Sequence, residues 1–250
     1  MIKKLFTLFI CLLSLAMTFT SCSDEAVDVE TVNKQTIFVF FPWTGGTSST
    51  GLKDYLESNV DSMCAGIVDK KGLTNTRVLV FFTEKYNQST LYDLQYDATT
   101  KTVNRIPIKK YEGNSHCTAE GFADLLNDVR QNAEALNYSL IIGAHGCGWT
   151  YASDWVNYPY KARPKGGSIR NGNEENAVSN ATSNSFSGIQ FGSDPNKPVT
   201  RFFGSVSQAD NAIDVTTLAE GIKLSGLKMQ YILFDACYMG NVETAYELKD

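Results

Sequence analysis

The chain has 250 residues, of which 43% are hydrophobic and 12% aromatic, and its formal net charge is −5. These values are typical of a globular protein with a sizeable core, organised as one or two domains. Because the balance is acidic and no stripe of Lys or Arg occurs, nucleic acid is excluded as an expected partner.

Residues 1–21 have the layout of an export signal. Lys3 and Lys4 form a positively charged start, the apolar stretch 5–19 follows, and small residues precede Cys22. The stretch is too short to span a bilayer comfortably. It resembles a bacterial lipoprotein signal, in which Cys22 becomes the lipidated N-terminus. An ordinary signal-peptidase cleavage site is the alternative.

Residues 22–35 are polar and acidic, without apolar periodicity, and predict a tether between a membrane and a folded domain. Within them, Ser23-Asp24-Glu25 resembles the acidic stretch that sends some lipoproteins to the cell surface. We therefore expect an exported protein that is lipid-anchored to a bacterial outer membrane or cell surface.

The predicted domain occupies residues 36–250 and begins with strands over 36–41 and 77–82. Residues 91–96 and 102–108 predict a hairpin that extends one edge of a sheet. A helix is predicted between the first two strands, with one face formed by Leu52, Tyr55, Leu56, Asn59, Val60 and Met63.

The clearest helical pattern begins at Thr118, a suitable N-cap residue. It leads into a predicted buried strand over 139–144. Later, Asp214 caps a second predicted helix, which leads into a predicted buried strand over 231–234. These alternations predict an α/β domain with a mostly parallel sheet. The apolar face of the predicted helix that begins at Thr118 consists of Phe122, Leu125, Leu126, Val129, Ala133 and Leu136.

Reactive side chains follow two of these strands. His145 follows one, Cys237 follows the other, and a helical pattern with Val242, Ala245 and Tyr246 on one face comes next. In parallel sheets, active sites gather at the carboxyl ends of strands, and a helix N-terminus stabilises a thiolate. If the strands are parallel neighbours, their ends lie ~5 Å apart, which suits a Cys–His dyad.

Other interpretations of the cysteines stay open. An isolated Cys237 would more often be a small buried side chain in a turn. The adjacent pair His116-Cys117 is a weaker catalytic candidate, because neighbouring side chains rarely adopt an attack geometry. No C-x-x-C occurs, so no zinc site is expected. One disulfide among Cys64, Cys117 and Cys147 remains open.

Residues 150–211 separate the two motifs and predict a long irregular insertion, rich in Asn, Ser, Gly and Pro. It is either a solvated insertion or an accessible loop that exposes basic cleavage points for self-processing. Its basic residues are Lys161, Arg163, Lys165, Arg170, Lys197 and Arg201.

Together, the segments 145–149 and 235–240, with sequences HGCGW and DACYMG, resemble the clostripain family of cysteine peptidases. This family belongs to the caspase–gingipain–legumain group. The resemblance covers about residues 36–250 and implies a caspase-like αβα sandwich with a mostly parallel central sheet. Cys147 departs from the usual glycine-rich run. Because members usually continue with further strands and helices, we expect the chain to be C-terminally truncated after Asp250.

The resemblance implies acyl transfer by a Cys–His dyad. Cys237 would attack the scissile carbonyl as a thiolate, while His145 removes the thiol proton and later protonates the leaving amine. The backbone N–H groups of Gly146 and Cys237 would form the oxyanion hole. Trp43 and Trp149 are candidates for contact with substrate, and Trp149 is equally suited to the core.

Asp235 precedes Cys237 by two residues, and in the family the matching Asp belongs to the specificity pocket. A buried carboxylate needs a cation, which a substrate side chain would supply. We therefore expect protein or peptide substrates with Arg or Lys before the scissile bond. Alternatively, Asp235 accepts backbone hydrogen bonds and only holds the turn.

No metal or other cofactor is expected from the residues. Calcium is allowed by the resemblance, although no calcium-loop pattern is visible. The expected function is that of a cysteine endopeptidase that processes itself. The alternative is a surface lipoprotein that acts as a binding module on an inactive peptidase scaffold.

Overall fold

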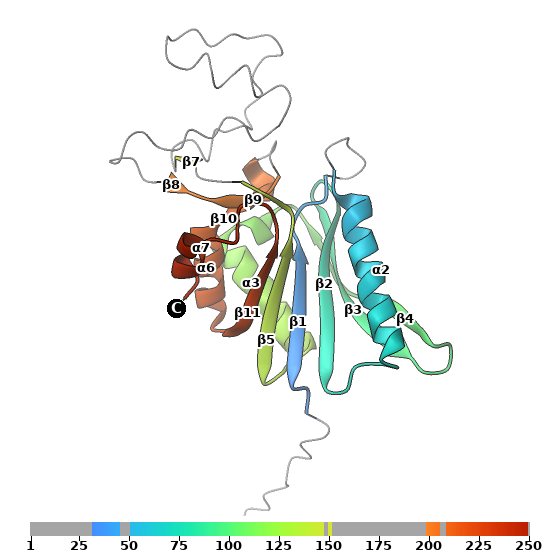
Figure 1. The fold of residues 1–250 in the computed structure, drawn as a ribbon. Coiled ribbons are helices and arrows are strands. Elements are labelled where there is room, and N and C mark those ends of the chain that lie inside the picture. The colour runs from blue at the N-terminus through green and yellow to red at the C-terminus, as the bar shows by residue number, and fades with distance from the viewer. Residues whose placement is uncertain (1–31, 46–50, 148–149, 152–198, 206–208, 250) are drawn as a thin grey trace, which may run out of the picture. The chain divides into compact units, whose positions relative to one another are not determined.

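A computed structural model describes residues 32–45, 51–147, 150–151, 199–205 and 209–249 (Figure 1). The export signal, Cys22 and the tether as far as residue 31 lie outside these residues. A compact unit begins at Asn33 and contains all the helices and strands described below. Within the described ranges, no helix is long and apolar enough to cross a membrane.

A six-stranded sheet with the order β11-β5-β1-β2-β3-β4 forms the centre of the fold (Figure 1). Strands β11, β5, β1 and β2 are parallel, whereas β3 and β4 are added by antiparallel pairing. This arrangement confirms the predicted α/β class and places the predicted hairpin, β3 and β4, at one edge. The strands are β1 (Gln35–Phe41), β2 (Thr76–Lys85), β3 (Gln88–Asp97), β4 (Thr102–Glu112), β5 (Asn137–Gly143) and β11 (Met229–Asp235).

Helices cover both faces of the sheet, which makes the fold an αβα sandwich (Figure 1). Successive side chains of a strand point to opposite faces. Accordingly, Phe38 and Phe40 of β1 belong to the core under α3 and α6, whereas Val39 and Phe41 belong to the core under α2. The helices are α2 (Lys53–Asp69), α3 (Ala119–Asn132), α6 (Val215–Ser225) and the short α7 (Val242–Glu247).

The two predicted N-caps are confirmed. The Thr118 hydroxyl accepts a hydrogen bond from the backbone N–H of Gly121 at 3.1 Å, and the Asp214 carboxylate accepts one from Thr217 at 2.8 Å. Each bond satisfies a backbone donor that the first helical turn leaves unpaired. Leu136 was wrongly predicted on the face of α3. The helix ends at Asn132, and Leu136 is exposed.

Part of the predicted irregular insertion is regular. Phe202 and Phe203 are fully buried in the core, and this burial fixes β9 between β6 and β10 in a three-stranded sheet. The prediction of irregular structure was therefore wrong for residues 150–151, 199–200, 202–204 and 209–211, whereas residues 152–198 and 206–208 lie outside the described part. The short elements are β6 (His145–Gly146), β7 (Thr150–Tyr151), β8 (Val199–Thr200), β9 (Phe202–Gly204), β10 (Ala212–Asp214), η2 (Ser115–Cys117) and η3 (Ala209–Asn211).

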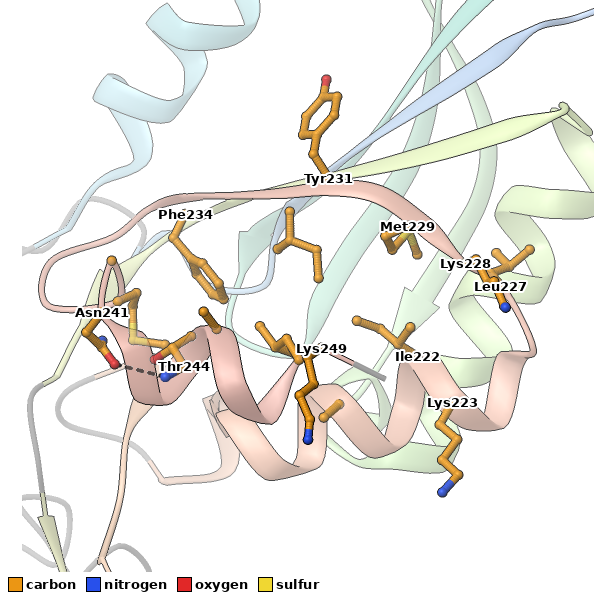
Figure 2. Close-up of a pocket in the computed structure, with 16 residues that line it drawn as sticks. Ile222, Lys223, Leu227, Lys228, Met229, Tyr231, Phe234, Asn241, Thr244 and Lys249 are labelled. Carbon is orange, nitrogen blue, oxygen red and sulfur yellow. Dashed lines mark hydrogen bonds between the residues drawn. The ribbon is translucent and has the colours of Figure 1, made fainter.

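Strand β11 was predicted to be buried, but one of its faces is exposed. It is the edge strand of the sheet in the described part of the chain, and none of its side chains belongs to the core under α2. Tyr231 and Leu233 are 42% and 48% exposed, whereas Phe234 packs against the core on the side of α6. Figure 2 shows this alternation, with Tyr231 directed away from the helices and Phe234 directed toward them.

The predicted apolar face of α7 is also wrong. Val242 and Tyr246 are mostly exposed, and Thr244 is the buried residue of this helix. The helix is only six residues long, and the spacing of three apolar residues was too little evidence to predict which of its sides packs against the core.

Candidate active site

Strands β5 and β11 are parallel neighbours, as the dyad hypothesis requires. Their register pairs Phe234 with Ile142 and Asp235 with Gly143. The backbone N–H of Ala144 also donates to the carbonyl oxygen of Asp235, at 3.4 Å. The segments that carry His145 and Cys237 therefore leave adjacent strands at the same edge of the sheet.

Direct backbone contact joins the two segments at Gly146. A Cβ atom on this residue would lie 1.9 Å from the carbonyl oxygen of Cys237 and 2.9 Å from its backbone nitrogen. Only glycine permits this approach. Cys237 is exposed and His145 is half-buried, so the thiol is accessible beside the end of the neighbouring strand.

Trp43 packs against His145, with ring centroids 5.2 Å apart at an interplanar angle of 43°. Trp43 is buried and follows β1, the other neighbour of β5. The next residue, Thr44, donates its hydroxyl to the carbonyl oxygen of Thr83 at 2.7 Å, which holds this loop to β2. Trp43 was predicted as a substrate contact, and its described contact is with the imidazole. Trp149 lies outside the described residues.

A turn, rather than a helix N-terminus, follows Cys237. Helix α7 begins only at Val242, after the N-cap residue Asn241. The expected stabilisation of the thiolate by this helix is therefore withdrawn, because dipole effects fall off within the first turn. The turn contains Tyr238 at φ = 62°, a left-handed conformation that is uncommon outside glycine.

Sequence reasoning missed two residues that contact this edge of the sheet. Arg201 donates from Nη1 to the carbonyl oxygen of Tyr238 at 2.8 Å. Asn59 of α2 donates from Nδ2 to Oδ2 of Asp235 at 3.3 Å. Neither residue stands beside a motif, so no local signal pointed to them.

Asp235 is exposed, whereas it was expected to be a buried carboxylate that requires a cation. The exposure follows from the position of β11 at the edge of the described sheet. In the part of the chain that is described, neither Lys nor Arg forms an ion pair with Asp235. Its carboxylate carries the hydrogen bond from Asn59 and is accessible to a cation from solution.

A pocket of about 660 Å³ lies between β11 and helices α6 and α7 (Figure 2). Ile222, Phe234 and Met239 are among its lining residues, and neither His145 nor Cys237 contributes to it. The pocket therefore lies beside the turn that follows the cysteine, and it is separate from the place where a scissile bond would meet the thiol.

Comparison with known proteins agrees with this geometry. The model of the clostripain family matches residues 190–250, which include the strand and turn of Cys237. A secreted C11 cysteine protease from Bacteroides thetaiotaomicron, "iotapain", is 28% identical with a TM-score of 0.63, over 88% of this chain and 50% of its own. The chain thus resembles the clostripain family of C11 cysteine proteases.

Other comparisons bear on the fold alone. An inactive zymogen C11 protease from Parabacteroides distasonis is 20% identical with a TM-score of 0.55, over 88% of this chain and 46% of its own. No curated protein matches the sequence. The chain thus spans about half the length of the solved structures that it matches.

The alternative pair, His116 and Cys117, lies in the core of the fold. His116 is 2% exposed, packs between Phe40 and Phe81, and has Nε2 3.2 Å from the carbonyl oxygen of Pro42. Burial lowers the pKa of His116 to about 4 and raises the pKa of the Cys117 thiol to about 12. Both groups are therefore neutral near pH 7, and the pair offers no thiolate.

The buried His116 should make the fold sensitive to acid. Its pKa in the folded protein, about 4, lies below the ordinary value of 6.5, so the unfolded chain binds the proton more readily between these values. Stability conferred by the neutral ring is complete above pH 6.5 and is lost as the pH falls toward 4. We expect a loss of about 3 kcal/mol from this residue.

Urea unfolding of the wild type and of His116→Gln at pH 7 and pH 4 measures this effect. The variant keeps an amide donor for the Pro42 carbonyl but has no group that titrates, and the other acidic and basic groups are common to both proteins. The wild type should lose about 3 kcal/mol more unfolding free energy between the two pH values. Equal losses in both proteins would contradict the buried, neutral imidazole.

No disulfide links the four cysteines in the described ranges, which are Cys64, Cys117, Cys147 and Cys237. Within the same ranges, no group of three or more His, Cys, Asp or Glu side chains could hold a metal ion. A calcium requirement stays a prediction.

Proposed function

We propose that the chain carries the catalytic dyad of a cysteine endopeptidase, with Cys237 as nucleophile and His145 as general base and acid. The observation that supports this most is the backbone contact between Gly146 and Cys237, which joins the two strand ends. The family match and the similarity to iotapain point to the same chemistry.

The reaction has two halves. His145 takes the thiol proton, and Sγ of Cys237 bonds to the scissile carbonyl carbon. The C–N bond then breaks as His145 gives its proton to the leaving amine, which leaves a thioester. Water attacks the thioester with His145 again as base, and the acid product leaves as the thiol is restored.

Transition-state charge collects on the carbonyl oxygen in both halves. We assign its stabilisation to the backbone N–H groups of Gly146 and Cys237, and the close approach of these two residues supports the assignment. Two such donors, fixed before the reaction begins, stabilise the developing oxyanion without reorganisation. Trp43 would limit the movement of the His145 ring by packing against it.

Asp235 is proposed to select Arg or Lys before the scissile bond. Its carboxylate is exposed, and the hydrogen bond from Asn59 restrains it without neutralising its charge. Arg should be preferred over Lys because a planar guanidinium can form two parallel hydrogen bonds with a carboxylate. The opposing possibility is that Asp235 serves the turn alone.

Asp235→Asn should lower kcat/KM for an Arg substrate by about 100-fold, because it removes the charge that pairs with the guanidinium. The test is a peptide series that differs only in the residue before the scissile bond. Asp61→Asn, which removes an exposed carboxylate of α2, is the matched control and should leave the series unchanged. A wild-type preference for Asp or Asn, or an equal loss for every peptide, would contradict this pocket.

Four further properties are proposed for the protein as its gene encodes it. Export is supported by the leader and by the description of iotapain as secreted, and lipidation is assigned to Cys22. Self-processing is placed at basic residues within 152–198. A calcium requirement is proposed on family resemblance alone and is tested by chelation. The alternative of an inactive binding module gains no support from the family match.

A further inference from the structure

The turn that follows Cys237 needs support from its surroundings. Tyr238 adopts φ = 62° although it is not glycine, and such a conformation persists only where neighbouring groups hold it. Its side chain is 63% exposed and so contributes little packing. Its carbonyl oxygen accepts two hydrogen bonds of 2.8 Å, one from Nη1 of Arg201 and one from Nδ2 of Asn241.

Arg201 is itself held at both ends. Its side chain is 11% exposed, and Nη2 lies 3.6 Å from Oε2 of Glu243 in α7. Its backbone carbonyl accepts a hydrogen bond from the N–H of Val215, at the start of α6, at 2.9 Å. Arg201 was grouped with the accessible basic residues of the insertion, but this burial and bonding make it unsuitable as a cleavage point.

The segment that begins with Arg201 also holds the histidine side of the site. In β9, Gly204 pairs with His145, and the carbonyl oxygen of Phe202 accepts a hydrogen bond from the N–H of Cys147 at 2.8 Å. Residues 201–204 therefore contact both sides of the site. Their backbone binds the strand that carries His145, and the side chain of Arg201 binds the turn that follows Cys237.

We propose that Arg201 is a positioning residue, which fixes the Cys237–Tyr238 turn so that the thiol meets His145 and the scissile carbonyl. The inference rests on the proposed function, in which Cys237 is the nucleophile. A hydrogen bond from a charged guanidinium is stronger than one between neutral groups, so the Tyr238 carbonyl loses its firmer restraint when the arginine is removed. A displacement of about 1 Å at a reacting group costs about 100-fold in rate.

The test compares Arg201→Ala and Arg201→Lys with the wild type, expressed as the gene encodes it. Arg201→Ala should lower kcat by about 10- to 100-fold with KM within about threefold, because the arginine does not contact substrate. Arg201→Lys keeps the positive charge but lacks the planar fork that reaches Tyr238 and Glu243 together, so an intermediate kcat is expected. Guanidinium ion at millimolar concentration should restore part of the kcat of Arg201→Ala.

Arg77→Ala is the matched control. Arg77 also donates to a backbone carbonyl, that of Asn132 at 3.0 Å, and pairs with a carboxylate, Asp93, but it lies at the opposite end of the sheet. The variant Arg77→Ala should lower thermal stability at least as much as Arg201→Ala does, but its kcat should stay within twofold of the wild-type value. If both variants lose kcat in proportion to stability, Arg201 has a structural role only and the proposal is overturned.

A second readout does not depend on turnover. Mass spectrometry follows the rate at which iodoacetamide alkylates Cys237 near pH 7, and this rate should fall about 10-fold in Arg201→Ala as the thiol loses its alignment with His145. An alkylation rate within twofold of wild type would overturn the role of Arg201. An inactive wild type would instead overturn the proposed function, and the alkylation rates would still decide the positioning role.

Discussion

Replacement of Gly146 by alanine is expected to abolish measurable peptide hydrolysis. The added methyl group would lie 1.9 Å from the carbonyl oxygen of Cys237 and 2.8 Å from its carbonyl carbon, and both are backbone atoms that no side-chain rotation can move. The two segments must therefore separate, and with them the thiol and the imidazole. We expect kcat to fall by at least about 100-fold and unfolding free energy by about 1–3 kcal/mol.

Gly66→Ala is the control for this substitution. Gly66 lies within α2, and no atom lies within 4 Å of the place where its Cβ would stand. Alanine there should raise stability by about 0.5–1 kcal/mol and leave kcat unchanged. Steady-state kinetics and thermal unfolding of both variants make the comparison. Full activity in Gly146→Ala would show that the two segments do not need this contact.

Cys237→Ala is expected to abolish turnover, and His145→Ala should lower kcat by about 10⁴-fold. Removal of the nucleophile leaves no atom to form the thioester, and removal of the imidazole leaves the thiol largely protonated. Alanine at Cys64, Cys117 or Cys147 should leave measurable turnover. The measurement is kcat of each variant and of the wild type with a blocked Arg peptide. Circular dichroism checks that each variant is folded.

The same variants report on self-processing. Wild-type protein should yield two fragments on denaturing gels, whereas Cys237→Ala should remain intact. Equal fragmentation of both proteins would assign the cleavage to another protease. Undiminished turnover in Cys237→Ala would remove the nucleophile from the proposed function.

Local patterns were sufficient to predict much of this fold. The spacing of apolar residues predicted strand β1 and helix α3, and capping chemistry predicted the Thr118 cap. Both signals depend on residues close in sequence. The placement of His145 and Cys237 followed from the expectation that their strands are parallel neighbours, and the pairing of β5 with β11 confirms that expectation. Each predicted element thus drew on a signal within one short segment, whereas the dyad prediction combined two segments.

Features set by distant segments were not predictable. The exposure of Asp235 depends on which strand lies at the edge of the sheet, and no window of sequence around Asp235 contains that information. Arg201 stands 37 residues before Tyr238, in a stretch that resembles a polar loop, and its burial depends on how α7 and the Cys237 turn fold around it. Buried Phe202 and Phe203 were the available signal for β9, and the polar composition around them obscured it.

The most direct test of the Cys237–His145 dyad is covalent labelling by a peptidyl chloromethyl ketone with Arg at the reactive end. Intact mass and peptide mapping identify the labelled atom in the protein expressed as its gene encodes it. We predict one label per chain, on Sγ of Cys237, with a labelling rate at least about 100-fold lower in His145→Ala. Labelling of Cys64, Cys117 or Cys147 instead, or an equal rate in His145→Ala, would contradict the dyad.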